Sequence, residues 1–321
     1  MTALHSPLAR FIVVRLLYTV AVLLGVIVAV FFLMQVVPGD PVRIALGTRY
    51  TPESYEALRS ASGLDQPLAS QLVNYVGSAF TGDLGVSFRN SEPVTTMLFD
   101  RLPATITLAT AAIVVALLIA VPLGFWAALR EGRLADNVIR VVSQFGISVP
   151  DFWMGILLIG LFSTALGWLP SAGYQPFADD PLGWLEHLVL PAITVGVVTG
   201  AIMTRYVRSS VLDVANAPFV TTAESKGLST KRVLLDHVGR NALVPVLTIS
   251  GIQFAGLLGG VIVVEVVFAW PGLGLLVYDS VAARDYPVLQ GAILLIAVIF
   301  LVVNLVVDIL YAVIDPRIRL S

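Results

Sequence analysis

The stretch NAPFVTTAESKGLSTKRVLLDHVGRNALVP, from Asn216 to Pro245, is the longest polar segment in the second half of a largely apolar chain. It contains both lysines of the protein, Lys226 and Lys231. Long ordered loops between apolar segments are usually functional. The stretch is therefore the first place to look for the function of the protein.

Residues before Gly227 are arranged for a short helix. Proline is favoured in the first turn of a helix, so Pro218 can begin it, with Asn216 as a possible cap. A glycine commonly follows the last turn, as Gly227 does here. Ser229 is placed to cap a second helix that runs into the next apolar stretch. Three apolar side chains fall on one side of the first helix: Phe219, Val220 and Ala223.

The segment also contains a series of short motifs, namely Thr222-Ala223, Lys226-Gly227-Leu228-Ser229, Arg232-Val233, His237 and Arg240-Asn241-Ala242-Leu243-Val244-Pro245. They resemble the signature loop of the membrane subunits of bacterial ABC importers, in particular the peptide and nickel permeases. In that family the loop is the coupling helix, which docks into a cleft of a cytoplasmic ATPase. This chain departs from the family pattern at Thr221, where an acidic residue is usual, and at Glu224, where peptide permeases often have a basic residue.

The resemblance implies a set of residues that face the ATPase: Phe219, Thr222, Ala223, Glu224, Lys226, Gly227, Leu228, Arg232 and His237. The alternative for the same segment is a solvated basic loop that is kept in the cytoplasm only by its charge.

Composition indicates an integral membrane protein. Hydrophobic residues make up 57% of the chain and charged residues 12%, whereas soluble domains average about 25% charged residues. The absence of cysteine excludes disulfides and thiolate metal sites. The first apolar run, Leu16 to Val37, is longer than the hydrophobic core of a signal peptide, so we expect it to remain as an anchor.

Six apolar stretches are long enough to cross a bilayer as helices, which predicts an all-α membrane protein. They are approximately Phe11–Val37, Leu102–Leu129, Val138–Leu166, His187–Val207, Leu243–Ala269 and Val288–Ile314. We expect residues 1–101 to form an anchor helix followed by a structured extracytoplasmic segment. Residues 102–321 form the permease core, with the cytoplasmic coupling loop at residues 216–242.

Basic residues are distributed unevenly between the two sides of these stretches. Of the 19 basic residues, 13 lie at one set of ends, and the short loops at the opposite ends contain only Arg284. The positive-inside rule therefore places both termini and the coupling loop in the cytoplasm of a multi-pass inner-membrane protein.

The long outer segment, Pro38 to Arg101, is expected to be structured. A helix is predicted from Thr51-Pro52-Glu53 to Gly63, and an amphipathic helix follows that ends near Gly82. One interpretation is a helix on the outer membrane surface or under a docked binding protein. The other is a hairpin that braces the bundle.

Several polar residues fall inside the apolar stretches, where they are costly and often functional. If the third span is a straight helix, Asp151 lies about 16 Å from Arg140 along its axis, near the middle of the membrane. For Glu265 and Asp308, bonding to neighbouring helix ends is favoured over contact with substrate. The candidates for the translocation path or its gate are Asp151, Gln253, Glu265, Asn304 and Asp308.

Prolines and glycines inside the spans predict bends and close contacts between helices. The prolines are Pro122, Pro150, Pro191 and Pro245, and the glycines of the fifth span are Gly251, Gly256, Gly259 and Gly260. Further motifs that resemble the peptide permeases are Pro38–Pro41, Gly82–Gly85, Ser148–Trp153, Leu166–Pro170, Phe268–Gly274, Asp285–Val288 and Asp315–Arg319.

Three functions are open to a membrane protein with these features. A passive permease subunit is consistent with the absence of the Gly-Lys pair of a phosphate-binding P-loop, since the two lysines follow Ser225 and Thr230. A proton-coupled secondary transporter would use Asp151 or Asp308. An intramembrane hydrolase is disfavoured because no Gly-x-Ser-x-Gly motif occurs and the only histidines, His5, His187 and His237, lie at or outside membrane edges.

The resemblance extends from Pro38 to Arg319 and implies the six-helix type I permease fold of a dipeptide or oligopeptide ABC importer. It also implies the partners: a homologous second permease, two cytoplasmic ATPases and an extracytoplasmic peptide-binding protein. ATP and Mg²⁺ would bind the ATPases, and this non-catalytic chain would bind no cofactor or nucleic acid. The cargo is left open among a dipeptide, a longer peptide, glutathione and chelated nickel.

Overall fold

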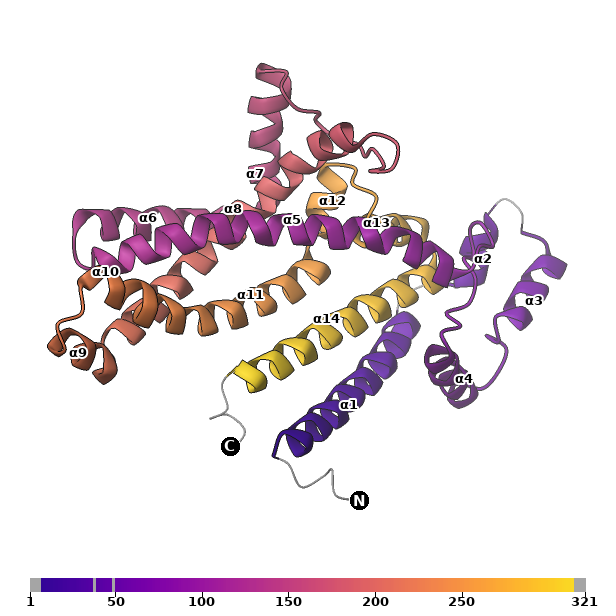
Figure 1. Ribbon diagram of the computed structural model, residues 1–321. Helices are drawn as coiled ribbons and strands as arrows, with labels where there is room; N and C mark the ends of the chain where they lie inside the picture. Colours follow the sequence, from indigo (N-terminus) through magenta and orange to yellow (C-terminus); the bar gives the residue numbers. More distant parts are fainter. Residues whose placement is uncertain (1–6, 37–38, 48–49, 315–321) are drawn as a thin grey trace. The chain divides into compact units, whose positions relative to one another are not determined.

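The computed structural model describes residues 7–36, 39–47 and 50–314, and these residues are helical apart from turns and one isolated β-bridge between Val86 and Pro93 (Figure 1). The motif at Pro38–Pro41 lies partly outside the described residues. The motif at Asp315–Arg319 and its two arginines lie entirely outside them.

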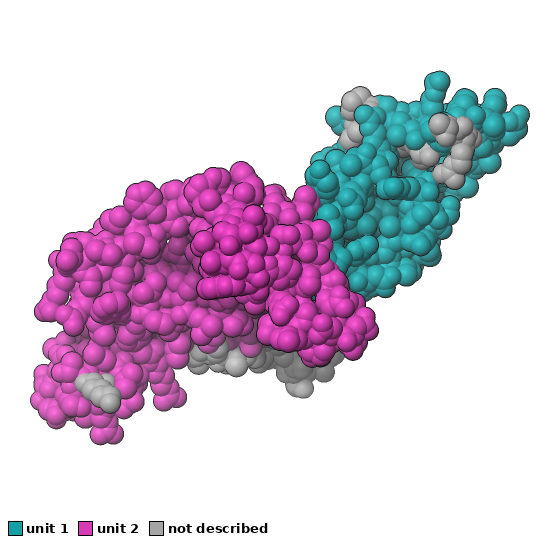
Figure 2. Space-filling view, turned by 90° about the horizontal axis from the view of Figure 1, so that it is seen from above, with its two compact units in different colours: residues 1–105, 271–305 teal, residues 106–270, 306–321 magenta. Residues whose placement is uncertain are grey.

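Contacts divide the chain into two compact units (Figure 2). Unit 1 consists of residues 1–105 and 271–305, and unit 2 consists of residues 106–270 and 306–321. Two long helices, α5 (Val94–Leu129) and α14 (Tyr286–Ile314), pass from one unit into the other. The sequence had suggested a division after Arg101 and did not predict that the segment after Trp270 joins the N-terminal residues.

Five helical stretches are long and apolar enough to cross a membrane, and a sixth is obtained if one bent pair of helices counts as a single span. The five are α1 (Pro7–Val36), α5, α8 (Pro181–Ala215), the continuous stretch of η4 (Val233–Gly239) and α11 (Arg240–Gly260), and α14. This confirms the all-α membrane class.

The third predicted span is not straight. It consists of α6 (Leu134–Ser148), α7 (Asp151–Leu158) and the π-helix η3 (Ile159–Ala165), with a bend of 98° after Ser148. The cause is local: a residue before proline avoids the helical conformation, and Val149 is extended, with φ −85° and ψ 123°. The third span therefore does not meet the condition, a straight helix, under which Asp151 was expected near the middle of the membrane.

Other prolines do not end their helices. Pro191 lies inside α8 and Pro245 lies inside α11. The predicted fifth span, Leu243–Ala269, is instead divided at Val261 into α11 and the short helix α12 (Ile262–Val267).

Unit 1 contains the short helices of the outer segment, α2 (Pro41–Leu46), α3 (Pro52–Ala61) and α4 (Leu68–Thr81). Thr51 caps α3 through a reciprocal pair of hydrogen bonds with Ser54. Gly63 and Gly82 adopt φ of +66° and +78° just beyond the ends of α3 and α4. α3 therefore begins and ends where the sequence predicted, and α4 ends where it predicted.

A buried apolar cluster in unit 1 joins α13 (Leu273–Ala283) to the first turns of α5 and α14. Its members are Val94, Leu98, Leu273, Leu276, Val288 and Ala292. The backbone N–H of Leu273 also donates to the Thr105 hydroxyl at 2.8 Å.

In unit 2, α8 packs against α6, α7 and α11. Small residues also allow a close approach between α8 and α5, as is usual between membrane helices. A Cβ placed on Gly196 of α8 would lie 2.6 Å from the Cβ of Val115 on α5, and a Cβ on Gly124 of α5 would lie 2.6 Å from the Cβ of Val207 on α8. Side chains at these two glycines would push the helices apart.

Candidate functional site

The segment between α8 and α11 forms the predicted short helix, α9 (Pro218–Ser225). Gly227 follows it with φ +76° and donates its N–H to the carbonyl of Glu224 at 2.9 Å. A Cβ on Gly227 would meet no atom within 4 Å. The constraint at this position is therefore the left-handed backbone and not lack of space.

Asn216 has a different role from the one predicted. It ends α8 as the C-cap residue, and its side chain amide donates to the carbonyl of Leu212 at 3.0 Å. Ala217 occupies the N-cap position of α9 and makes no side-chain capping bond. Ser229 does precede the second helix, α10 (Thr230–Arg232), but its side chain makes no capping bond either.

One face of α9 is buried and the other is exposed. Val220 and Ala223 are 5% and 6% exposed, whereas Phe219 is 45% exposed. Phe219 is therefore less buried than predicted. It lies one turn from Ala223 but is turned by about 100° from Val220, which places it at the edge of the buried face. Three polar residues of the predicted ATPase-facing set are also exposed: Thr222, Glu224 and Lys226.

The buried face of α9 rests on a cluster of small apolar side chains from the ends of other helices. α5 contributes Ala128, α8 contributes Val207 and Val211, and η4 contributes Val233 and Val238. Leu228 packs against the same cluster. In Figure 1, α9 and α10 lie at the end of unit 2 where α5 ends and α6 begins. The segment is therefore a packed element of the structure and not a solvated loop.

The part that leads into α11 is a π-helix, η4, where the sequence had suggested an ordinary helix. Such segments are rare and frequently occur at functional sites. Arg232 is exposed and lies 3.5 Å from the Asp236 carboxylate, and His237 is half-buried.

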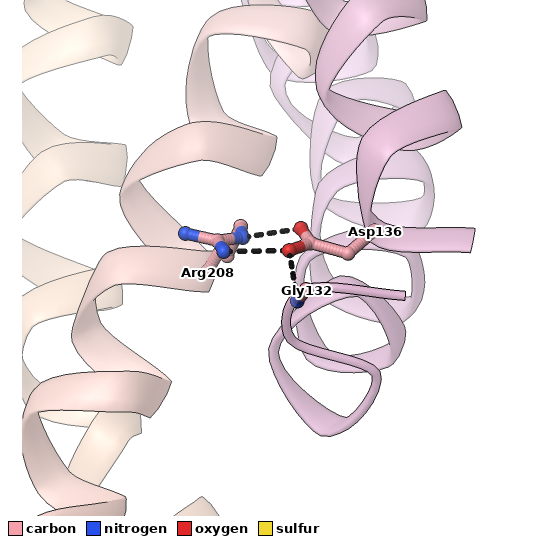
Figure 3. A network of polar contacts seen from close by, with 3 residues as sticks. All are labelled: Gly132, Asp136 and Arg208. Carbon is pink, nitrogen blue, oxygen red and sulfur yellow. Dashed lines mark hydrogen bonds and ion pairs between the residues drawn. The ribbon is translucent and has the colours of Figure 1, made fainter. Parts of the chain in front are cut away.

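Near this end of unit 2, sequence reasoning missed an ion pair between α6 and α8 (Figure 3). Arg208 donates from Nε to Oδ1 of Asp136 at 2.6 Å and from Nη2 to Oδ2 at 2.8 Å. The N–H of Gly132 donates to Oδ2 at 3.0 Å. The Asp136 side chain is 1% exposed. No local pattern could have revealed this pair, because the two residues are 72 positions apart.

The polar candidates inside the spans lie on several elements. Asp151 begins α7 and is half-buried, and Glu265 is fully buried in α12. Because α7 and α12 contact each other, these two residues lie on neighbouring elements. Gln253 is half-buried in α11.

Asn304 and Asp308 lie one turn apart on α14, and the Asn304 amide donates to the carbonyl of Phe300 at 2.9 Å. Within the described ranges, no group of three or more His, Cys, Asp or Glu side chains is placed to hold a metal ion.

The motif that begins at Phe268 fixes a neighbouring loop. The carbonyl of Phe268 accepts a hydrogen bond from the N–H of Gly173 at 2.8 Å. Trp270 is fully buried and packs edge-on against Tyr174, with ring centroids 4.8 Å apart. In this structure the motif joins the turn after α12 to the loop before α8.

These features define an integral membrane subunit in which apolar helices support a packed polar element at one end. Residues 120–320 match the family model described as "Binding-protein-dependent transport system inner membrane component". Residues 8–109 match the model for the N-terminal part of such membrane components. The chain therefore belongs to the family of inner membrane components of binding-protein-dependent transport systems.

Relatives of known name agree with this family. A protein of Brucella abortus (strain 2308) named "Putative peptide transport system permease protein" is 43% identical over 305 residues, which cover 95% of this chain and 97% of the relative. The glutathione transport system permease protein GsiC of Escherichia coli (strain K12) is 42% identical over 310 residues, which cover 97% and 99%. A crystal structure of an amino acid ABC transporter with histidines aligns at 18% identity and a TM-score of 0.48, over 70% of this chain and 94% of that chain.

The protein is thus a permease subunit of an ABC importer in the inner membrane, as the resemblance had indicated. The family does not favour the alternative of a proton-coupled carrier.

Proposed function

We propose that this chain forms half of the translocation path of an ATP-driven peptide importer and receives the movement of a cytoplasmic ATPase through α9. The observation that carries this proposal is the two-sided structure of α9. Its buried residues, Val220 and Ala223, share an apolar cluster with side chains of α5, α8 and η4, whereas Phe219, Thr222 and Glu224 are exposed. Aromatic side chains are enriched at protein interfaces, so the exposed Phe219 is a suitable contact for a partner.

The proposed cargo, a peptide, is based on the names of the relatives. Their names specify peptides and glutathione, which is itself a small peptide, and the alignments cover nearly the whole of each chain. A path that passes peptides is therefore the best-supported assignment, and the extracytoplasmic binding protein would select among them.

The proposed complex contains this chain, a homologous second permease, two cytoplasmic ATPases and an extracytoplasmic peptide-binding protein. The family description supports the last of these, since it names dependence on a binding protein. In this proposal ATP and Mg²⁺ bind the ATPases, and this chain is non-catalytic and binds no cofactor. The lack of a Gly-Lys phosphate loop in its sequence supports the part of the proposal that concerns ATP.

The proposed orientation has both termini and α9 in the cytoplasm, supported by the uneven distribution of basic residues. The ATPase contacts would come from the predicted coupling residues, of which Phe219, Thr222, Glu224, Lys226 and Arg232 are exposed. Buried Ala223 would hold the helix in place, with Gly227 and Leu228 fixing its end and His237 bordering it. Asp151, Gln253, Glu265, Asn304 and Asp308 remain the proposed residues of the path or its gate.

The test replaces Gly227, whose backbone adopts φ +76°. A β-branched residue is strained in this conformation by roughly 1–2 kcal/mol, whereas asparagine tolerates it better. Gly227→Val is expected to lose peptide uptake and to retain less ATPase on purification, with a normal amount of protein in the membrane. Gly227→Asn is the matched control and is expected to keep both peptide uptake and retention of the ATPase on purification.

The measurement is uptake of a labelled peptide in proteoliposomes, together with the amount of ATPase that co-purifies with the permease. Wild-type uptake and ATPase retention in Gly227→Val would contradict the coupling role of α9.

A further inference from the structure

We propose that the ion pair between Asp136 and Arg208 is a positioning contact that makes α6 move together with α8 when the ATPase displaces α9. The proposal rests on the function proposed for α9, and it adds the step by which a displacement at α9 reaches the spans.

The geometry of the pair is well suited to this task. Both oxygens of Asp136 accept from a single guanidinium group, at 2.6 and 2.8 Å, so that the two groups are parallel and cannot rotate independently (Figure 3). The N–H of Gly132 binds the same carboxylate, which attaches the turn between α5 and α6 to the pair. The contact therefore connects three parts of unit 2: α6, α8 and the α5–α6 turn.

Burial makes the pair difficult to separate. The side chain of Asp136 is 1% exposed and that of Arg208 is 21% exposed. Separating them would leave an uncompensated buried charge, which is strongly unfavourable. The pair Arg232–Asp236 is different: its atoms are 3.5 Å apart and both side chains are more than half exposed, so the two can separate without leaving a buried charge.

A continuous route leads from α9 to this pair. The buried residues Val220 and Ala223 of α9 share an apolar cluster with Val207 and Val211 of α8, the residues that flank Arg208 in the sequence. From Arg208 the helix α8 continues without a break to Ala215, just before α9. A displacement of α9 therefore acts on α8 within two turns of Arg208.

Beyond the pair, α6 leads to the 98° bend and to α7. α7 carries Asp151 and contacts α12, which carries Glu265. A further close approach between α6 and α8 is apolar: a Cβ on Gly146 would lie 2.8 Å from the Cβ of Ala201. To this apolar packing the two-pronged guanidinium–carboxylate contact adds a polar contact with a defined direction and distance.

The test uses the complete complex in proteoliposomes and compares Arg208→Lys with Asp136→Asn. Lysine retains the positive charge but not the planar fork, so it distinguishes a geometric role from a purely electrostatic one. Both variants are expected to assemble with the ATPase and to hydrolyse ATP, while the amount of peptide transported per ATP falls about tenfold, which corresponds to the loss of roughly one charge-assisted hydrogen bond. Arg205→Gln is the matched control, because Arg205 is exposed on the same helix, and it is expected to transport normally.

Normal transport per ATP in both variants would overturn the proposal. Failure of both variants to assemble would also overturn it, because the pair would then be needed only for folding. If Asp136→Asn alone fails to assemble, the amount of peptide that Arg208→Lys transports per ATP tests the proposal by itself: a fall supports it and a normal value overturns it. Gly227→Val is measured in parallel: if it keeps its ATPase and its uptake, then the function proposed for α9 is wrong, whatever the result at Arg208.

Discussion

The carboxylate of Asp285 holds residues that are almost 200 positions away in the sequence. Its Oδ2 accepts a hydrogen bond from the Ser87 hydroxyl, and its Oδ1 accepts the backbone N–H of Phe88 at 3.1 Å. Asp285 and Ser87 are 5% and 2% exposed. Within unit 1, this contact attaches the loop between α4 and α5 to the residue that joins α13 to α14.

We expect Asp285→Ala to loosen this loop, because the mutation leaves two hydrogen-bond donors without an acceptor. An unsatisfied buried donor costs about 1–3 kcal/mol. Proteolysis of the loop at Phe88 or Arg89 in purified protein should become faster. Asp279→Ala is the control, since Asp279 is exposed on α13. Equal cleavage rates in wild type and Asp285→Ala would show that the contact does not hold the loop.

Single cysteines test the proposed orientation, because the natural chain has none. An impermeant thiol reagent applied to the outside of cells should label cysteines placed at Asp65 or Asp179. It should not label a cysteine at Lys226 until the membrane is opened. All three positions are exposed in the structure, so differences in labelling would report the side of the membrane. Labelling of Lys226→Cys alone from outside would require the inverted topology.

The contact between α2 and α3 predicts a pH dependence. Burial of Asp40 opposes its ionisation, but the Tyr55 hydroxyl, the N–H groups of Arg43 and Val42 and the charge of Arg59 together hold the pKa of Asp40 below its ordinary value of 3.8. The hydrogen bond to Asp40, at 2.5 Å, is the main cause that raises the pKa of Tyr55 above 10.0.

The signs of these two shifts define the pH range of the contact. Because folding lowers the pKa of Asp40, the ionised carboxylate stabilises the folded state above pH 3.8. This stabilisation is lost as the pH falls through the lowered pKa. Because folding raises the pKa of Tyr55, the protonated hydroxyl stabilises the folded state below pH 10.0. This stabilisation is lost as the pH rises through the raised pKa. The protection factors of the α3 amides, which compare measured exchange with the intrinsic rate at each pH, should therefore be high between these limits and lower outside them. Tyr55→Phe should weaken both changes, and an unchanged profile would refute the assignment.

Much of the local structure could be predicted from the sequence. Thr51 begins α3, and Gly63, Gly82 and Gly227 follow the ends of α3, α4 and α9 with positive φ. These signals act through backbone conformation and hydrogen bonds within a few residues, so they do not depend on the rest of the fold. The apolar spans were predictable for a similar reason, since a bilayer requires a minimum length of apolar helix.

Tertiary structure alone decided which distant residues meet. The pairing of Arg208 with Asp136 and that of Ser87 with Asp285 depend on how helices pack, because the partners are separated by 72 and 198 positions. The outward position of Phe219 depends on which face of α9 finds apolar neighbours on α5 and α8. Pro150 indicated a bend in the third span, but the 98° angle between α6 and α7 could be known only from the structure, since a proline removes a hydrogen bond without specifying a direction.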